Sequence, residues 1–168
     1  MALVLNIETA TTNCSVSLSK DGETLVLKED NSLGYSHAET LHLFIDEVFK
    51  ISKLKPSEID AVAVSKGPGS YTGLRIGVSS AKGLCFALEK PLISISTLES
   101  LAHQVKATDG LIIPMLDARR MEVYSAIYNQ NLELQREIKA EILSEESYSE
   151  LLDSNKVYFI GNGVEKTK

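Results

Sequence analysis

Residues 62–77 combine an apolar strand, a glycine-rich turn and the start of a helix, a succession typical of α/β folds. In the turn, Gly67 and Gly69 flank Pro68 and permit backbone angles that a side chain disfavours. The free N–H groups at a helix start attract anions, which would suit a phosphate-binding loop. The loop matches neither GxGxxG nor GxxxxGK[ST], however, so we interpret Gly67, Pro68 and Gly69 as a structural turn that packs closely.

Hydrophobic periodicity predicts the elements before and after this turn. A buried strand at 3–7 is followed by an alternating strand at 15–19, an Asp-Gly hairpin and a third strand at 24–28. The following elements are expected to be a helix at 37–54, a strand at 59–65, a helix that ends near residue 88 and a strand at 92–95.

The second half repeats this order. It has three expected strands at 111–116, 123–128 and 132–139, a helix opened by Ser144, and a strand at 157–160. The first copy continues into a second helix and a last strand, whereas the second copy stops after a glycine turn. We therefore expect a truncated or fragmentary chain with duplicated βββαβα lobes, the second incomplete.

Composition narrows the class of protein. A formal net charge of -6 and a pI near 5.1 argue against a chain that wraps nucleic acid by itself. The two cysteines, Cys14 and Cys85, lie far apart and indicate neither a disulfide framework nor a zinc site. No stretch reads as a signal peptide or a membrane span, so we expect a cytoplasmic protein without a membrane partner.

Six stretches of sequence, in order along the chain, resemble the TsaB family, also called YeaZ. They are IETATTNCSVSL, YSHAETLHLFIDEVF, GPGSYTGLRIG with the AKGLCFAL and KPLISISTLESLA that follow it, and MLDARRMEVYSAIY. This family is related to TsaD within the actin-like ATPase superfamily, so the resemblance implies an actin-like ATPase (ribonuclease H-like) fold. It also implies two lobes, an N-terminal one over 1–105 with the partner-binding helices and a truncated second one over 106–168.

The resemblance implies a function in tRNA modification. TsaB is a partner of the catalytic subunit TsaD and, with TsaE, supports transfer of a threonylcarbamoyl group to an adenosine next to the tRNA anticodon. A non-catalytic subunit of this kind would bind and activate TsaD, contact tRNA only through the complex, and form a homodimer when alone.

Two hairpin turns hold phosphates in active members of the superfamily, and both look weakened here. The first offers Glu8, Thr9, Thr11 and Thr12, which are weak nucleotide-binding candidates because no glycine allows close backbone approach. The second reads Asp-Ala-Arg-Arg at 117–120 rather than being glycine-rich. Its two arginines could bind an anion, but a surface or interface ion pair is favoured.

We expect neither a bound metal nor catalytic residues nor a cofactor. TsaD-like enzymes carry an HxxxH pair at positions that resemble Thr97 and Leu101 here, and neither residue replaces a histidine ligand. We interpret His37, His42 and His103 as surface or structural histidines. The same loss argues against the metallopeptidase label sometimes attached to this family.

The helix after the turn is apolar nearly all round, and its charge is confined to a narrow stripe. Its own sheet can cover one side only, so the other side is expected to bind a partner, with small residues allowing close approach. Cover by the chain's own other helix or by a missing C-terminal segment is the alternative. The expected interface on the two helices comprises Leu41, Phe44, Ile45, Val48, Gly73, Ile76, Gly77, Ser80, Gly83 and Ala87.

This interpretation predicts that Gly77→Leu or Ser80→Arg weakens TsaD binding and leaves the lobe folded. Two other interpretations stay open. One is an active nucleotide-binding phosphotransferase or acyltransferase of the actin-like fold. The other is a homodimeric structural module with no TsaD role.

Overall fold

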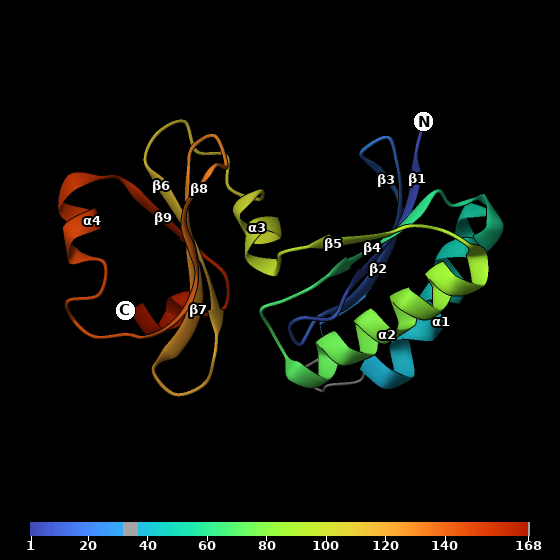
Figure 1. Ribbon diagram of the computed structural model, residues 1–168, viewed down its shortest axis with the longest axis horizontal. Coiled ribbons are helices and arrows are strands. Elements are labelled where there is room, and N and C mark those ends of the chain that lie inside the picture. The colour runs from blue at the N-terminus through green and yellow to red at the C-terminus, as the bar shows by residue number, and fades with distance from the viewer. Residues whose placement is uncertain (32–36, 168) are drawn as a thin grey trace. The chain divides into compact units, whose positions relative to one another are not determined.

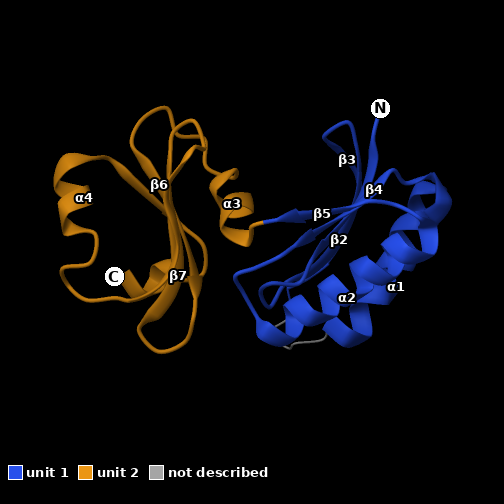
Figure 2. Ribbon diagram, viewed as in Figure 1, with its two compact units in different colours: residues 1–95 blue, residues 96–168 orange. Residues whose placement is uncertain are grey.

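The computed structural model describes residues 1–31 and 37–167. The chain divides into two compact units, Met1–Ile95 and Ser96–Lys168, which Figure 2 shows in different colours. Each unit is built around its own sheet and its own hydrophobic core.

Unit 1 has a five-stranded sheet in the order β3-β2-β1-β4-β5. Strand β2 pairs antiparallel with both β1 and β3, whereas β4 pairs parallel with β1 on one side and with β5 on the other. Its elements are β1 (Leu3–Glu8), β2 (Cys14–Lys20), β3 (Glu23–Asp30), α1 (His37–Ser52), the 3-10 helix η1 (Pro56–Glu58), β4 (Ala61–Ser65), α2 (Tyr71–Leu88) and β5 (Leu92–Ile95).

Both long helices of unit 1 pack on one face of this sheet (Figure 1). Every second residue of β1 and β2 is buried beneath them. The sequence predicts this alternation for β2, whereas it predicts a continuously buried strand for β1. The β2–β3 hairpin turns at Asp21 and Gly22, whose φ angles of 51° and 88° are those of a tight primed turn. The buried core joins strands β1, β2 and β4 to helices α1 and α2.

Unit 2 has a four-stranded sheet in the order β8-β7-β6-β9. The parallel pair is β6 with β9, and the other neighbours are antiparallel. Its elements are α3 (Thr97–Ala102), β6 (Leu111–Asp117), β7 (Glu122–Asn129), β8 (Leu134–Ile142), α4 (Ser149–Ser154), β9 (Val157–Ile160) and the 3-10 helix η2 (Val164–Thr167).

The unit 2 sheet is covered on both faces. Ile112 and Leu116 of β6 pack with α3 on one side, whereas Ile113 and Met115 pack with residues of the α4 and η2 region on the other. A strand buried on both faces requires an uninterrupted apolar sequence, and β6 has one. The repeated βββαβ order predicted from the sequence is therefore present in both units.

Two details differ from the sequence analysis. The expected helix at Ser144 is wrong, because residues 144–148 form turns and α4 begins only at Ser149. Tyr148 directly before it has a φ of 65°, and a left-handed residue of this kind interrupts a right-handed helix. Strand β8 also begins and ends later than expected, at Leu134 and Ile142.

Helix α3 belongs to unit 2. Its Leu98 and Ala102 are buried in the core that it shares with β6. The lobe boundary expected at residue 105 instead places this helix in the first lobe. A short amphipathic helix shows which of its sides is apolar but not which sheet that side covers.

Candidate functional site

The turn between β1 and β2 is tied to the end of β4 through Glu8. One carboxylate oxygen of Glu8 accepts the Ala10 N–H at 2.6 Å, and the other accepts a hydrogen bond from the Ser65 hydroxyl. Thr9 is fully buried in this turn. These contacts give Glu8 a structural role at the ends of two neighbouring parallel strands.

The N-terminus of α2 is packed against this same turn. The Ser70 hydroxyl accepts the Gly73 N–H and caps the helix, and the Ser70 N–H donates to the Ala10 carbonyl at 2.6 Å. A Cβ atom at Gly69 would lie 2.4 Å from the Ala10 carbonyl oxygen, and one at Gly73 would lie 2.1 Å from that of Thr9. Gly69 therefore permits the close packing expected of the glycine-rich turn.

These contacts do not suit a phosphate at the helix start. The actin-like superfamily implies a nucleotide, but here the carbonyl oxygens of Thr9 and Ala10 lie over the N-terminal turn of α2, and their partial negative charge opposes an anion. Among the weak candidates, Thr11 uses its hydroxyl to accept the Asn13 N–H at 3.3 Å, and Thr12 is exposed. The first hairpin turn thus does not fit the phosphates of a nucleotide.

Two of the three histidines form structural hydrogen bonds, and the third lies at the surface. His37 is buried, and its Nε2 donates to the Thr11 carbonyl at 2.7 Å. His42 forms a hydrogen bond of 3.3 Å with Ser80, which joins α1 to α2, and His103 is exposed at the end of α3. The described part of the chain contains no group of three or more His, Cys, Asp or Glu side chains placed to hold a metal ion.

Three of the interface residues expected on α1 are buried in the unit's own core. Leu41, Ile45 and Val48 face the sheet and are inaccessible to a partner, so their assignment to an interface is wrong. Phe44 is half-buried and lies beneath the Lys28 ammonium, 5.9 Å from the ring centroid. The apolar stripe on this helix is the face that folding itself buries.

The small residues of α2 are also turned inward. Gly73, Gly77 and Ala81 are buried, and a Cβ atom at Gly77 would lie 2.2 Å from the Thr9 hydroxyl oxygen. The assignment of Gly73 and Gly77 to a partner surface is therefore wrong. The backbone that approaches these glycines closely is the chain's own, at Thr9. Gly77→Leu is accordingly expected to disturb the fold of unit 1 rather than leave it intact.

The outward side of α2 carries the remaining expected interface residues. Ile76 and Ser80 are half-buried, and Gly83 and Ala87 are exposed. Phe86 lies on the same side and is 89% exposed, which is extreme for so large an apolar side chain. We call these five residues the α2 outer face.

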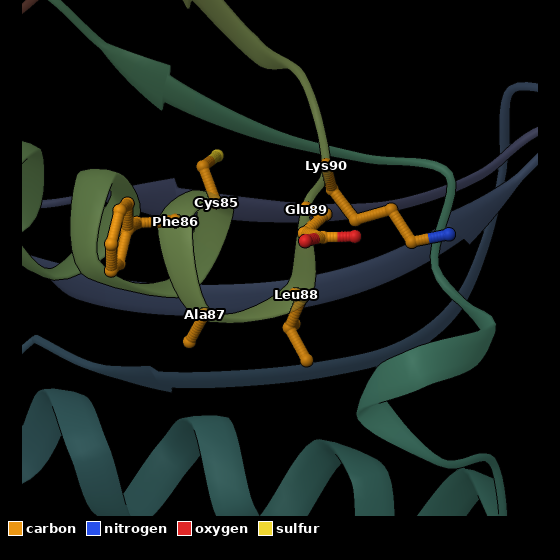
Figure 3. Close-up of a pocket in the computed structure, with 6 residues that line it drawn as sticks. All are labelled: Cys85, Phe86, Ala87, Leu88, Glu89 and Lys90. Atoms are coloured by element: carbon orange, nitrogen blue, oxygen red, sulfur yellow. The ribbon is translucent and has the colours of Figure 1, made fainter.

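A shallow depression surrounds the end of α2, where residues 85–90 line it (Figure 3). Figure 3 shows the side chains of Cys85, Phe86 and Lys90 leaving the backbone in different directions. Small-molecule sites place a few polar groups so that they converge on a ligand, and these side chains do not converge. Burial raises the pKa of the Cys85 thiol, which disfavours its reactive thiolate form. The end of α2 therefore lacks the character of a small-molecule site.

The comparisons with known proteins agree on one group. The family model for TsaD, tRNA N6-adenosine threonylcarbamoyltransferase, matches residues 33–156. The Bacillus subtilis tRNA threonylcarbamoyladenosine biosynthesis protein TsaB is 34% identical over 125 residues, which cover 74% of this chain and 54% of that protein. The chain belongs to the TsaB (YeaZ) family. The Escherichia coli TsaB is 35% identical over 130 residues, covering 76% and 55% of the two proteins.

Solved structures of YeaZ proteins share the fold. YeaZ from Pseudomonas aeruginosa superposes with a TM-score of 0.75 at 25% identity and covers 96% of this chain and 85% of that one. A second structure, of an uncharacterized protein with similarity to peptidase YEAZ from the same organism, gives 0.72 at 30% identity over 88% of this chain and 68% of that one. The TsaB chain thus has the actin-like ATPase fold expected from its sequence.

This TsaB chain spans about half the length of the curated relatives it matches. None of the helices in the described ranges is long and apolar enough to cross a membrane.

Proposed function

We propose that this chain is a non-catalytic subunit that binds and activates TsaD during synthesis of threonylcarbamoyladenosine on tRNA. The names of its relatives support the pathway. The exposure of Phe86 on the α2 outer face carries the proposal of a protein-binding role. Large aromatic side chains are enriched at the centres of protein interfaces and are seldom left in water.

The surroundings of Phe86 favour a protein partner. Gly83 and Ala87 beside it are exposed, and a Cβ atom at Gly83 would meet nothing within 4 Å, so a partner's backbone can approach closely there. Lys82 and Glu89 are exposed and form a charged rim. An apolar centre within a charged rim is the usual composition of a protein interface.

The contacts of the β1–β2 turn support the absence of catalysis. The carbonyl oxygens of Thr9 and Ala10 lie where a bound phosphate would meet the start of α2. We infer that tRNA chemistry belongs to TsaD and that this subunit meets TsaE within the same complex in the cytoplasm. When TsaD is absent, the α2 outer face would pair two copies of the chain. Tight binding of ATP and Mg²⁺ by the isolated protein in calorimetry would instead favour the alternative of an active phosphotransferase.

Co-purification tests the proposed surface. We expect Phe86→Asp to abolish most recovery of tagged TsaD by the full-length protein, because an interface cannot bury an unpaired carboxylate without a large loss of affinity. Ser80→Arg should weaken recovery as well. A matched control is Ile142→Asp, which places the same charge at an apolar position of β8 that is 78% exposed.

The control variant should recover TsaD as the wild type does. Circular dichroism of Phe86→Asp should show an intact fold, since its side chain contributes little to the core. If Phe86→Asp still recovers TsaD at the wild-type level, the α2 outer face is not the interface.

A further inference from the structure

The turn between β6 and β7 presents two adjacent arginines to solvent. Arg119 and Arg120 are exposed, and no salt bridge within residues 1–31 and 37–167 involves either of them. The chain's other arginines are engaged: Arg75 lies against Tyr71, and Arg136 is paired with Glu141. The pair at 119–120 is therefore available to bind an external anion.

A set of hydrogen bonds holds this turn in place. Asp117 accepts the Arg119 N–H at 2.5 Å and the Lys166 ammonium at 2.6 Å, and Lys166 also donates to the Glu122 carbonyl at 2.9 Å. The Asp117 N–H donates to the Asn162 side chain at 2.9 Å. The backbone that carries both guanidinium groups is thus fixed from strand β7 and from the segment that contains η2.

The backbone angles of the turn do not explain why arginine occupies it. Arg119 and Arg120 have φ angles of 72° and 49°, in the left-handed region that Gly, Asn and Asp adopt at lower energy. A conformational cost of this kind is common where a side chain serves a function. The turn therefore carries arginine at two positions where its backbone angles would favour other residues.

The local charge favours an anion even though the chain is acidic. Lys166, Arg119 and Arg120 are cationic, and Asp117 and Glu122 are the carboxylates of the turn and its flanks. The hydrogen bond from Lys166 holds the pKa of Asp117 below its ordinary value, so this carboxylate is ionised and already paired. Neither arginine forms a salt bridge among the described residues, although the charge of Arg119 also contributes to lowering the pKa of Asp117.

We propose that Arg119 and Arg120 bind phosphate oxygens, and that the RNA backbone supplies them. The planar guanidinium donates two parallel hydrogen bonds to a phosphate, a geometry that lysine does not offer. Two such groups on adjacent residues of one exposed turn suit a ligand that carries several phosphates, as an RNA strand does. This inference rests on the proposed function, which brings the subunit to a tRNA substrate together with TsaD.

Salt-dependent tRNA binding by the full-length protein in complex with TsaD tests the proposal. Each phosphate contact contributes roughly 0.7 to 0.9 to the slope of log K against log salt concentration, so losing two contacts lowers that slope by about 1.5. Between 50 and 200 mM salt, the complex with Arg119→Ala/Arg120→Ala should accordingly lose roughly tenfold less affinity than wild type. Arg119→Lys/Arg120→Lys should retain most of the slope.

The matched control is Lys106→Ala/Lys139→Ala, which removes the same charge from exposed positions of the same unit. This control should change the slope little. An equal change in both double variants, or an unchanged slope in the arginine variant, would overturn the proposal. The proposal would also be overturned if the arginine variant bound tRNA as wild type does but lost ATP binding, because a nucleotide would then be the source of the phosphate. Unchanged tRNA binding with loss of an acidic protein partner would overturn it as well.

Co-elution of each variant with TsaD is measured first. A wild-type chain that does not co-elute contradicts the proposed function. A complex that forms normally and binds tRNA identically with and without the two arginines contradicts only the inference about the turn.

Discussion

At the scale of single residues, close contact with one threonine accounts for the presence of glycine at two positions of α2. Thr9 places its carbonyl oxygen against Gly73 and its hydroxyl against Gly77, at distances where a Cβ atom cannot fit. Small residues at helical spacing indicate that another segment of backbone packs closely against the helix. In this protein that segment is the turn at Thr9. Whether that backbone belongs to the same chain or to a partner is decided by tertiary structure, which the pattern does not contain.

This contact predicts opposite effects for two glycine substitutions in the same helix. Gly73→Ala should lower the free energy of unfolding by about 1 to 3 kcal/mol, because the added methyl group would lie 2.1 Å from the Thr9 carbonyl oxygen and the backbone must shift. Gly83→Ala, with open space around it, should raise that free energy by up to about 1 kcal/mol through helix propensity. Urea denaturation of both variants measures the difference. Equal effects at the two positions would contradict the assigned packing.

At the scale of elements, the sequence predicted the strands and helices whose apolar residues follow a regular pattern. A continuous apolar run identified β1, alternation identified β2, and the helical stripe of Leu41, Ile45 and Val48 identified α1. The start of α4 was missed because it depends on Tyr148, whose hydroxyl meets Ser125 at 2.8 Å across 23 residues. A hydrogen bond of that range leaves no local pattern.

The same limit applies to the candidate site. Sequence placed Gly83 and Ala87 in the interface, and the structure shows both exposed, with the exposed Phe86 beside them. Sequence also placed Gly73 and Gly77 in the interface, and the structure shows them buried. A helix that is apolar nearly all round has two plausible inner sides, and only the position of the sheet distinguishes them.

The polar cluster that joins β7, β8 and α4 predicts a pH dependence. Burial alone would raise the pKa of Glu141, but hydrogen bonds from Arg136, Ser125 and Tyr148 outweigh it and hold the pKa below its ordinary value. The unfolded chain therefore binds more protons than the folded one just below pH 4.5, and stability falls as pH decreases through the folded pKa. Above pH 4.5 this contribution is fully present.

We therefore expect the free energy of unfolding of Glu141→Gln to fall less steeply than that of wild type as pH is lowered below about 4.5. A control is Glu137→Gln, which removes an exposed carboxylate from the same strand. Its pH slope should follow wild type. Denaturation midpoints between pH 3 and 7 measure these slopes, and a Glu141→Gln slope that coincides with both others would show that the cluster does not govern acid stability.

At the scale of the whole molecule, the two units repeat one topology with separate cores. Strand orders β3-β2-β1-β4 and β8-β7-β6-β9 correspond element by element. The buried residues of unit 1 lie between Leu3 and Ala81, and α3 contributes to the core of unit 2. A core that is complete within one unit implies that the unit can fold independently.

The position of α3 in unit 2 allows the independent folding of unit 1 to be tested with two fragments. A fragment of residues 1–95 should unfold cooperatively, and extending it to residue 105 should leave its thermal midpoint unchanged, because Leu98 and Ala102 would then have no sheet of their own to cover. Leu98→Ser should likewise not affect the longer fragment, yet should destabilise the full chain by roughly 2 to 5 kcal/mol, since Leu98 is fully buried there. Circular dichroism melting of both fragments provides the measurement. A higher midpoint for 1–105 would place α3 with the first lobe, as the sequence boundary at residue 105 requires.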